Sequence, residues 1–141
     1  MNPKLLFAAA LFPLLAASAV AAPSAPPSAI GIKDPVTIAV SVKATAAQLK
    51  KAVRAALLNR GWKLDNEKDG YLEAALEHRD GRRAWTARIS LSYDAQQVVL
   101  HYVSSEGLQY DPAARTILSD YNGWMDILAK DLPVYLSLVT Q

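Results

Sequence analysis

Apolar and polar residues alternate through most of residues 71–104, a pattern typical of half-buried antiparallel strands. Within this stretch Asp80-Gly81 favours a two-residue turn, because both residue types tolerate the positive φ angles that such a turn needs. The turn aligns three apolar residues of the first strand with three of the second: Leu76 with Trp85, Ala74 with Ala87 and Leu72 with Ile89. A second turn within residues 93–97 adds a strand that keeps the same apolar face. The sequence therefore predicts a three-stranded meander.

The region before the meander predicts a strand, a helix and a further short strand. From residue 36 to residue 42 every second side chain is a β-branched aliphatic, which favours a strand. Thr45 and Gln48 match the capping box that starts a helix, and Gly61 is suited to end it in the left-handed conformation. The apolar stripe of this helix comprises Leu49, Val53, Ala56 and Leu57. A short strand at residues 62–66 then leads into the meander.

The region after the meander predicts one long helix. Asp111-Pro112 is a typical start, with Asp as N-cap and Pro at the first helical position, and Pro133 is expected to kink or end the helix. Its apolar positions are Ile117, Tyr121, Trp124 and Leu128. The order of elements, β-α-β-β-β-β-α, predicts an α+β fold over residues 35–141. We expect a five-stranded antiparallel sheet with both helices on one face, a helix-grip-like arrangement.

The first residues have the composition of a secretory signal peptide. Lys4 precedes an apolar run over residues 5–20, and Ala19-Val20-Ala21 is a small-x-small site, which predicts a cut after Ala21 and a periplasmic location. The alternative is an uncleaved membrane anchor, for which the run is shorter than the ~20 residues of a spanning helix. Residues 22–34 are rich in Pro, Ala and Ser and are expected to form an extended linker.

Composition narrows the classes of function. The chain has no cysteine, which excludes disulfides, thiolate metal sites and a lipidated N-terminal Cys. The 15 Lys and Arg residues fall to 14 without Lys4, against 13 Asp and Glu, so the charge gives no reason to expect a nucleic acid partner. Residues 36–63 hold basic but no acidic residues, whereas residues 104–141 are mainly acidic. The domain is therefore expected to be electrically two-sided.

Three basic residues lie on the polar side of the predicted first helix: Lys50, Lys51 and Arg54. They could meet an anionic partner, such as phospholipid headgroups or an acidic protein face. The alternative is an ordinary solvated helix face, which is the more common case.

No pattern of catalytic or metal-binding residues stands out. His78 and His101 have no second His or carboxylate at a ligand-like spacing, and the basic residues near them disfavour a cation. No Gly-x-Ser-x-Gly elbow surrounds Ser104 or Ser105, and there is no phosphate loop or dinucleotide fingerprint. We therefore expect no catalytic residue, no metal and no cofactor.

Tyr121-Asn122-Gly123-Trp124 is unusual in the middle of a predicted helix, because Asn and Gly together cost about 1.5 kcal/mol relative to Ala. Contacts with other parts of the protein must therefore stabilise these two residues in the helix. Our hypothesis is that the Asn122 amide bonds the backbone of the polar loop at residues 104–110, while Gly123 leaves room for something to approach. The candidate binding residues here are Ser105, Tyr110, Asn122 and Trp124.

Two motifs in this region, following a Tyr93-Asp94 turn, are Ser105-x-x-Leu108-x-Tyr110 and Ile117-x-x-x-Tyr121-Asn122-x-Trp124-x-x-x-Leu128. With them, residues 61–132 resemble a group of small exported proteins and lipoproteins of Gram-negative bacteria whose function is uncharacterised. The resemblance implies an envelope location and an antiparallel sheet with two helices, but no activity. The chain departs from the group in lacking a lipidated Cys and in having Pro133. By topology alone it is also similar to the helix-grip domains of lipoproteins that accompany outer-membrane β-barrel assembly.

These observations favour a non-enzymatic periplasmic binding or envelope-assembly module, with an envelope protein or an anionic membrane surface as partner. The alternative is a small ligand carrier or enzyme that uses a groove between the C-terminal helix and the sheet. That groove would lie near Trp85, Tyr102, Tyr110 and Trp124. A deep pocket with an ionisable residue inside would favour the alternative.

Overall fold

The computed structural model describes residues 29–141. The predicted signal peptide, its cut after Ala21 and residues 22–28 of the predicted linker lie outside them. The strands are β1 (Ala29–Gly31), β2 (Val36–Ala39), β3 (Lys63–Lys68), β4 (Tyr71–Asp80), β5 (Arg83–Tyr93), β6 (Gln97–Glu106) and β7 (Thr116–Leu118), and the helices are α1 (Ala46–Asn59) and α2 (Ser119–Val139).

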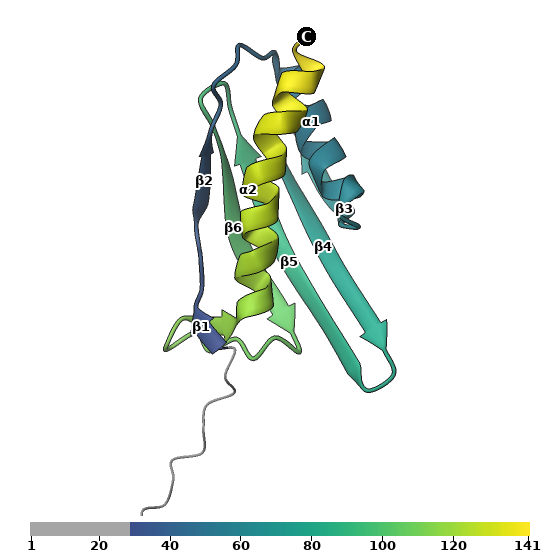
Figure 1. Cartoon of the computed structure of the whole chain (residues 1–141), viewed down its shortest axis with the longest axis vertical. Coiled ribbons are helices and arrows are strands. Elements are labelled where there is room, and N and C mark those ends of the chain that lie inside the picture. The colour runs from purple at the N-terminus through teal and green to yellow at the C-terminus, as the bar shows by residue number, and fades with distance from the viewer. Residues whose placement is uncertain (1–28) are drawn as a thin grey trace, which may run out of the picture.

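One antiparallel sheet has the strand order β2-β6-β5-β4-β3, and β1 pairs with β7 in a separate two-stranded sheet. Both helices lie across the same face of the larger sheet (Figure 1). The predicted α+β fold is therefore confirmed, with the small sheet as an addition that the sequence did not reveal.

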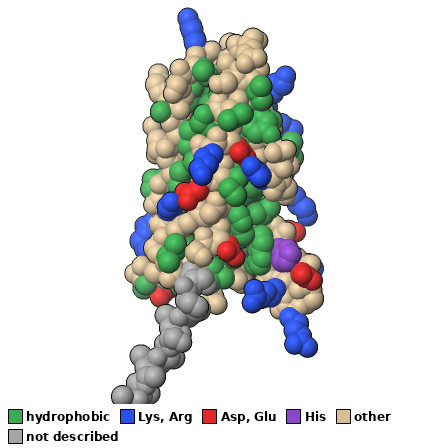
Figure 2. All heavy atoms as spheres, viewed as in Figure 1, with side chains coloured by type: hydrophobic (Ala, Val, Ile, Leu, Met, Phe, Trp, Pro, Cys, Tyr) green, Lys and Arg blue, Asp and Glu red, His purple; other side chains and the backbone are tan. Residues whose placement is uncertain are grey.

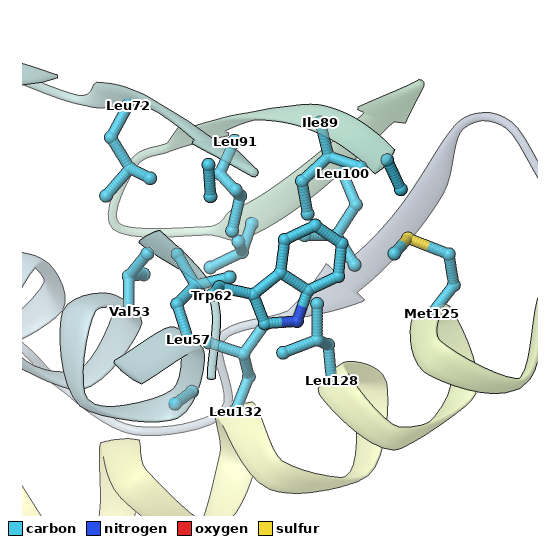
Figure 3. Close-up of a cluster of buried hydrophobic side chains, with 14 of the residues drawn as sticks. Val53, Leu57, Trp62, Leu72, Ile89, Leu91, Leu100, Met125, Leu128 and Leu132 are labelled. Atoms are coloured by element: carbon cyan, nitrogen blue, oxygen red, sulfur yellow. The ribbon is translucent and has the colours of Figure 1, made fainter. Parts of the chain in front are cut away.

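The core lies between this sheet face and the two helices. Trp62 is 2% exposed, and its ring stands among side chains of α1, α2 and the sheet (Figure 3). Its neighbours in this cluster include Val53, Leu57, Leu72, Ile89, Leu91, Leu100, Met125, Leu128 and Leu132. Burial of each large apolar side chain contributes about 1.5–3 kcal/mol. Covering the sheet with the helices is thus the main source of stability.

The predicted ends of α1 are confirmed. The Thr45 hydroxyl accepts from the Gln48 N–H, and the Gln48 side chain accepts from the Thr45 N–H, which completes the capping box. At the other end Gly61 has φ +84°, and the Trp62 N–H donates to the Leu57 carbonyl at 3.1 Å. This Schellman geometry turns Trp62 back under the helix.

The meander is present, but its predicted first turn is wrong by one position. Asp80 pairs with Arg83, so the two loop residues are Gly81 and Arg82, and every pair shifts by two residues: Leu72 faces Leu91 and Leu76 faces Ala87. Only Gly81 has positive φ in this loop, at +49°, so the second loop position does not need an Asn or Gly. Because a shift of two preserves the face of each side chain, the apolar face survives.

The predicted helix start at Asp111 is also wrong. The Asp111 carboxylate does accept from the N–H groups of Ala113 and Ala114, but the turn goes no further. Arg115 has φ +53°, a left-handed conformation that ends any helix at this point. The chain then forms β7, and α2 begins at Ser119.

Residues 29–34, expected to belong to the extended linker, are instead part of the folded domain. β1 pairs with β7, with Ile30 opposite Ile117. The Ile32 N–H donates to the Arg115 carbonyl at 2.9 Å. We call residues 29–34 the N-terminal strap.

α2 continues through Pro133 to Val139, so the prediction that this residue could end the helix is wrong. Pro133 lies on the exposed side, where water can bond the carbonyl that its missing N–H leaves free. The buried stripe also differs, because Trp124 is only half-buried while Asn122 and Met125 face the core. Across residues 29–141, neither helix has the length and apolarity needed to cross a bilayer.

Gly107 and Gly123 offer a matched test of the packing. Gly107 has φ +73°, and a Cβ there would overlap the Ala84 carbonyl oxygen and lie 3.1 Å from the Trp85 Cα. We expect Gly107→Ala to lower the free energy of unfolding by about 2–3 kcal/mol. Gly123 has nothing within 4 Å and lies inside α2, so Gly123→Ala should raise it by about 0.5–1 kcal/mol. Urea denaturation followed by circular dichroism measures both, and equal effects would contradict the close approach at Gly107.

Candidate functional site

The β4–β5 hairpin extends beyond the part of the sheet that the helices cover (Figure 1). Its end, residues 79–83, is exposed at every position, and we call it the hairpin tip. It carries three guanidinium groups, those of Arg79, Arg82 and Arg83, and one carboxylate, that of Asp80. Within residues 29–141, none of the three arginines has a carboxylate oxygen within 4.0 Å. The tip therefore carries a net positive charge, and none of its arginines is ion-paired within this range.

Stacked rings hold the base of the hairpin against α2. The ring centroids of His78 and Trp85 are 5.3 Å apart, and those of Trp85 and Trp124 are 4.4 Å apart. Such stacks contribute about 0.5–1.5 kcal/mol beyond the area that they bury. On the other side, Gly107 of the chain after β6 passes close to Trp85. The hairpin is therefore held in place at its base while its tip stays free.

Two open cavities flank Trp85. One of about 480 Å³ lies between the hairpin, with Arg82 and Arg83, and the segment that contains Leu108 and Asp120. The other, of about 230 Å³, is lined by the hairpin tip itself and by Glu106. Asp120 lines one cavity with Arg82 and Arg83, and Glu106 lines the other with Arg79 and Arg83. Neither carboxylate forms an ion pair with an arginine of the tip.

Aromatic side chains occupy most of the predicted groove between α2 and the sheet, and an open cavity of about 110 Å³ beside Trp62 and Trp124 remains. Tyr102 has its ring centroid 4.3 Å from that of Tyr110 and 5.6 Å from that of Tyr121. The Tyr102 hydroxyl lies 2.7 Å from the Ser105 Oγ. Ser105 and Tyr110 therefore belong to one tyrosine cluster, whereas Trp124 belongs to the stack at the hairpin base.

Tyr121 is the most enclosed member of this cluster. Its hydroxyl is buried and has no hydrogen-bond partner among residues 29–141. Burial raises the pKa of Tyr121 well above its usual range, and the negative charge of Asp34 adds to the shift. Tyr121 is therefore neutral, and its ring packs against that of Tyr102 in the cluster.

Asn122 does bond backbone groups, but not those of the 104–110 loop that we predicted. Its Oδ1 accepts from the Lys33 N–H at 2.9 Å, and its Nδ2 donates to the Gly31 carbonyl at 2.8 Å. The Lys33 ammonium also pairs with Asp126 at 2.8 Å. Asn122 thus fastens the N-terminal strap to α2, while neighbouring Gly123 faces open space.

The basic residues of α1 do not act as a group. Arg54 is ion-paired with Glu67, while Lys50 and Lys51 are exposed. Lys50 lines an open cavity of about 490 Å³ at the N-terminal end of α1. The other lining residues are Ala44, Ala46, Ala47, Leu49, Asp69, Gly70, Tyr93, Asp94 and Ala95. Burial, followed by the charges of Glu67 and Asp69, raises the pKa of Tyr93.

The two histidines lie in different surroundings. His78 stacks on Trp85, and the Nδ1 of His101 lies 3.8 Å from an oxygen of Asp34. In the part of the chain that the structure covers, no three His, Cys, Asp or Glu side chains are arranged to hold a metal ion.

Comparison of the chain with protein-family models and with curated protein sequences finds no match.

The structure therefore distributes the predicted site residues over three places. Lys50, Lys51 and Arg54 are on α1, Ser105 and Tyr110 are in the tyrosine cluster, and Asn122 and Trp124 are on α2. The sequence analysis missed the three arginines of the hairpin tip. Their signal was present, because three of the five residues 79–83 are Arg beside a predicted turn. Side chains at an exposed turn have few neighbours that could pair with them, so three arginines there are expected to stay unpaired.

Removal of the Asn122 amide tests its role in holding the strap. We expect Asn122→Ala to lower the free energy of unfolding by about 1–3 kcal/mol, because the Lys33 N–H and the Gly31 carbonyl lose their partner. Hydrogen exchange should speed up at the Lys33 amide more than at the Trp62 amide, which bonds within α1. Asn59→Ala, on an exposed position, is the matched control. Uniform acceleration at both amides would show that Asn122 stabilises the whole domain and not the strap in particular.

Proposed function

We propose that this protein is a non-enzymatic binding module of the bacterial envelope, and that it contacts its partner through the hairpin tip. The observation that carries the proposal is the concentration of three unpaired guanidinium groups on a projecting, exposed hairpin. The signal-peptide pattern and the resemblance to small exported proteins support an envelope location. The proposal assigns binding and no chemical step.

The proposal depends on the three arginines being unpaired before a partner binds. An arginine already paired with a carboxylate must lose that pair to bind an anion, whereas the three at the tip have no such pair to break. The stack of Trp85 on Trp124 fixes the hairpin base, which reduces the conformational entropy lost on binding. Arg54 of α1, by contrast, already forms an ion pair with Glu67. The hairpin tip is thus a better candidate contact than the α1 face that the sequence suggested.

A second candidate function, a small ligand carrier, is favoured by the cavity beside α1. Its volume of about 490 Å³ lies within the usual range for small-molecule sites. Four of its ten lining residues are alanine, and the charged side chains in the lining are those of Lys50, Asp69 and Asp94. This place differs from the groove that we predicted between α2 and the sheet.

Photo-crosslinking inside the periplasm tests the hairpin contact. A photoreactive residue in place of Arg82 should give crosslinked products with an envelope component, while the same residue in place of Lys51, exposed on α1, should not. Mass spectrometry identifies the products. Recovery of the same products from both positions, or of none from position 82, would contradict a specific contact at the hairpin.

Filling the cavity tests the carrier function. We expect Ala47→Trp to lower the affinity of the domain for an apolar fluorescent probe at least tenfold, because the indole occupies the space between Leu49 and Tyr93. Lys51→Trp, on the same helix but outside the cavity, is the matched control. Fluorescence titration gives both affinities, and unchanged binding to the Ala47→Trp variant would remove the carrier candidate.

A further inference from the structure

We propose that the partner of the hairpin tip is the headgroup layer of a bilayer that contains anionic phospholipid. This proposal rests on the proposed function and names the class of partner for the same site.

The chemistry of the tip fits phosphate. A guanidinium group presents a planar fork of donors that matches phosphate oxygens, and it is more weakly hydrated than an ammonium group. Three such groups lie within residues 79–83, where Asp80 is the only carboxylate. Asp80 stands opposite Arg83 in the strand register without forming an ion pair with it. The tip therefore keeps a net positive charge.

The surface chemistry favours a headgroup layer over a protein partner. Protein interfaces bury a well-packed central cluster, in which aromatic side chains and arginine are enriched and other charged residues depleted, inside a polar rim. The exposed large apolar side chains of the described domain are Ile30, Leu58, Val103, Ile127, Val134 and Leu138. None of them lies in the hairpin tip, whose contact must therefore be made by charge and hydrogen bonding. Basic residues near an anionic bilayer each contribute about 1 kcal/mol without any apolar anchor.

The position of the tip agrees with this assignment. It projects at the same end of the molecule as β1, where the described chain begins (Figure 1), and Lys and Arg side chains extend from this end in Figure 2. This end of the molecule therefore presents basic side chains to an approaching bilayer.

The acidic groups around the tip limit the contact to its end. Asp120 and Glu106 line the cavities beside Trp85, and Glu77 pairs with Lys63 at 3.3 Å further up the hairpin. A bilayer that approached the whole hairpin would meet these carboxylates. The end-on approach presents Arg79, Arg82 and Arg83 first, and it predicts a peripheral contact that salt weakens.

Vesicle binding tests the assignment. The protein purified after export is titrated with vesicles of phosphatidylglycerol and phosphatidylcholine in equal parts, and with vesicles of phosphatidylcholine alone. The test variant carries Arg79→Gln, Arg82→Gln and Arg83→Gln. The control carries Lys43→Gln, Lys51→Gln and Lys130→Gln, which removes the same charge from exposed positions elsewhere. Circular dichroism establishes that both variants are folded.

We expect binding to the anionic vesicles only, with a loss of about fivefold for each arginine removed and therefore about 100-fold for the triple variant. The control variant should lose less than about fivefold. Equal losses in the two variants would overturn the assignment, because net charge alone would then explain binding. If the unmodified protein ignores anionic vesicles while position 82 crosslinks to a protein, the lipid assignment fails and the proposed function stands. If neither experiment detects a partner, both fail.

Discussion

The whole structure depends on burial of one sheet face beneath two helices that come from distant parts of the chain. α1 and α2 run in opposite directions over the sheet, as shown by the contact of Gln48 with the Val139 carbonyl at one end and of Arg60 with Asp131 at the other. Trp62 fills the space between them. Neither helix alone covers the strands, so each is required for the other to be stable on the sheet.

This arrangement also decides where the protein can interact. Aromatic and aliphatic side chains fill most of the space between the helices and the sheet, and the place where we expected a groove keeps only a small open cavity of about 110 Å³. The sheet is longer than the layer of helices on it, and the uncovered length is the end of the β4–β5 hairpin. Residues in this uncovered end do not pack in the core. Arginine at these positions therefore lowers the free energy of unfolding very little.

The sequence predicted best those features whose cause is local. Hydrogen bonds across three residues define the capping box at Thr45, and alternation defines the strand faces, so both were predicted correctly. Alternation repeats every two residues, however, and cannot distinguish registers that differ by two, which is why the first hairpin was misaligned. The helix start at Asp111 and the partner of Asn122 failed for another reason. Both are decided by the N-terminal strap, about 90 residues away in the chain.

The bond between Asn122 and the strap has a consequence for the order in which the domain can form. The strap and α2 are separated by nearly the whole domain in sequence. β2 pairs with β6, and β1 pairs with β7. The contacts that complete the fold therefore join the beginning of the domain to its later elements. A chain emerging from a ribosome cannot complete such contacts until α2 has appeared. Closure of the domain therefore waits for the synthesis of α2, and it depends on contacts of long sequence separation, which form slowly.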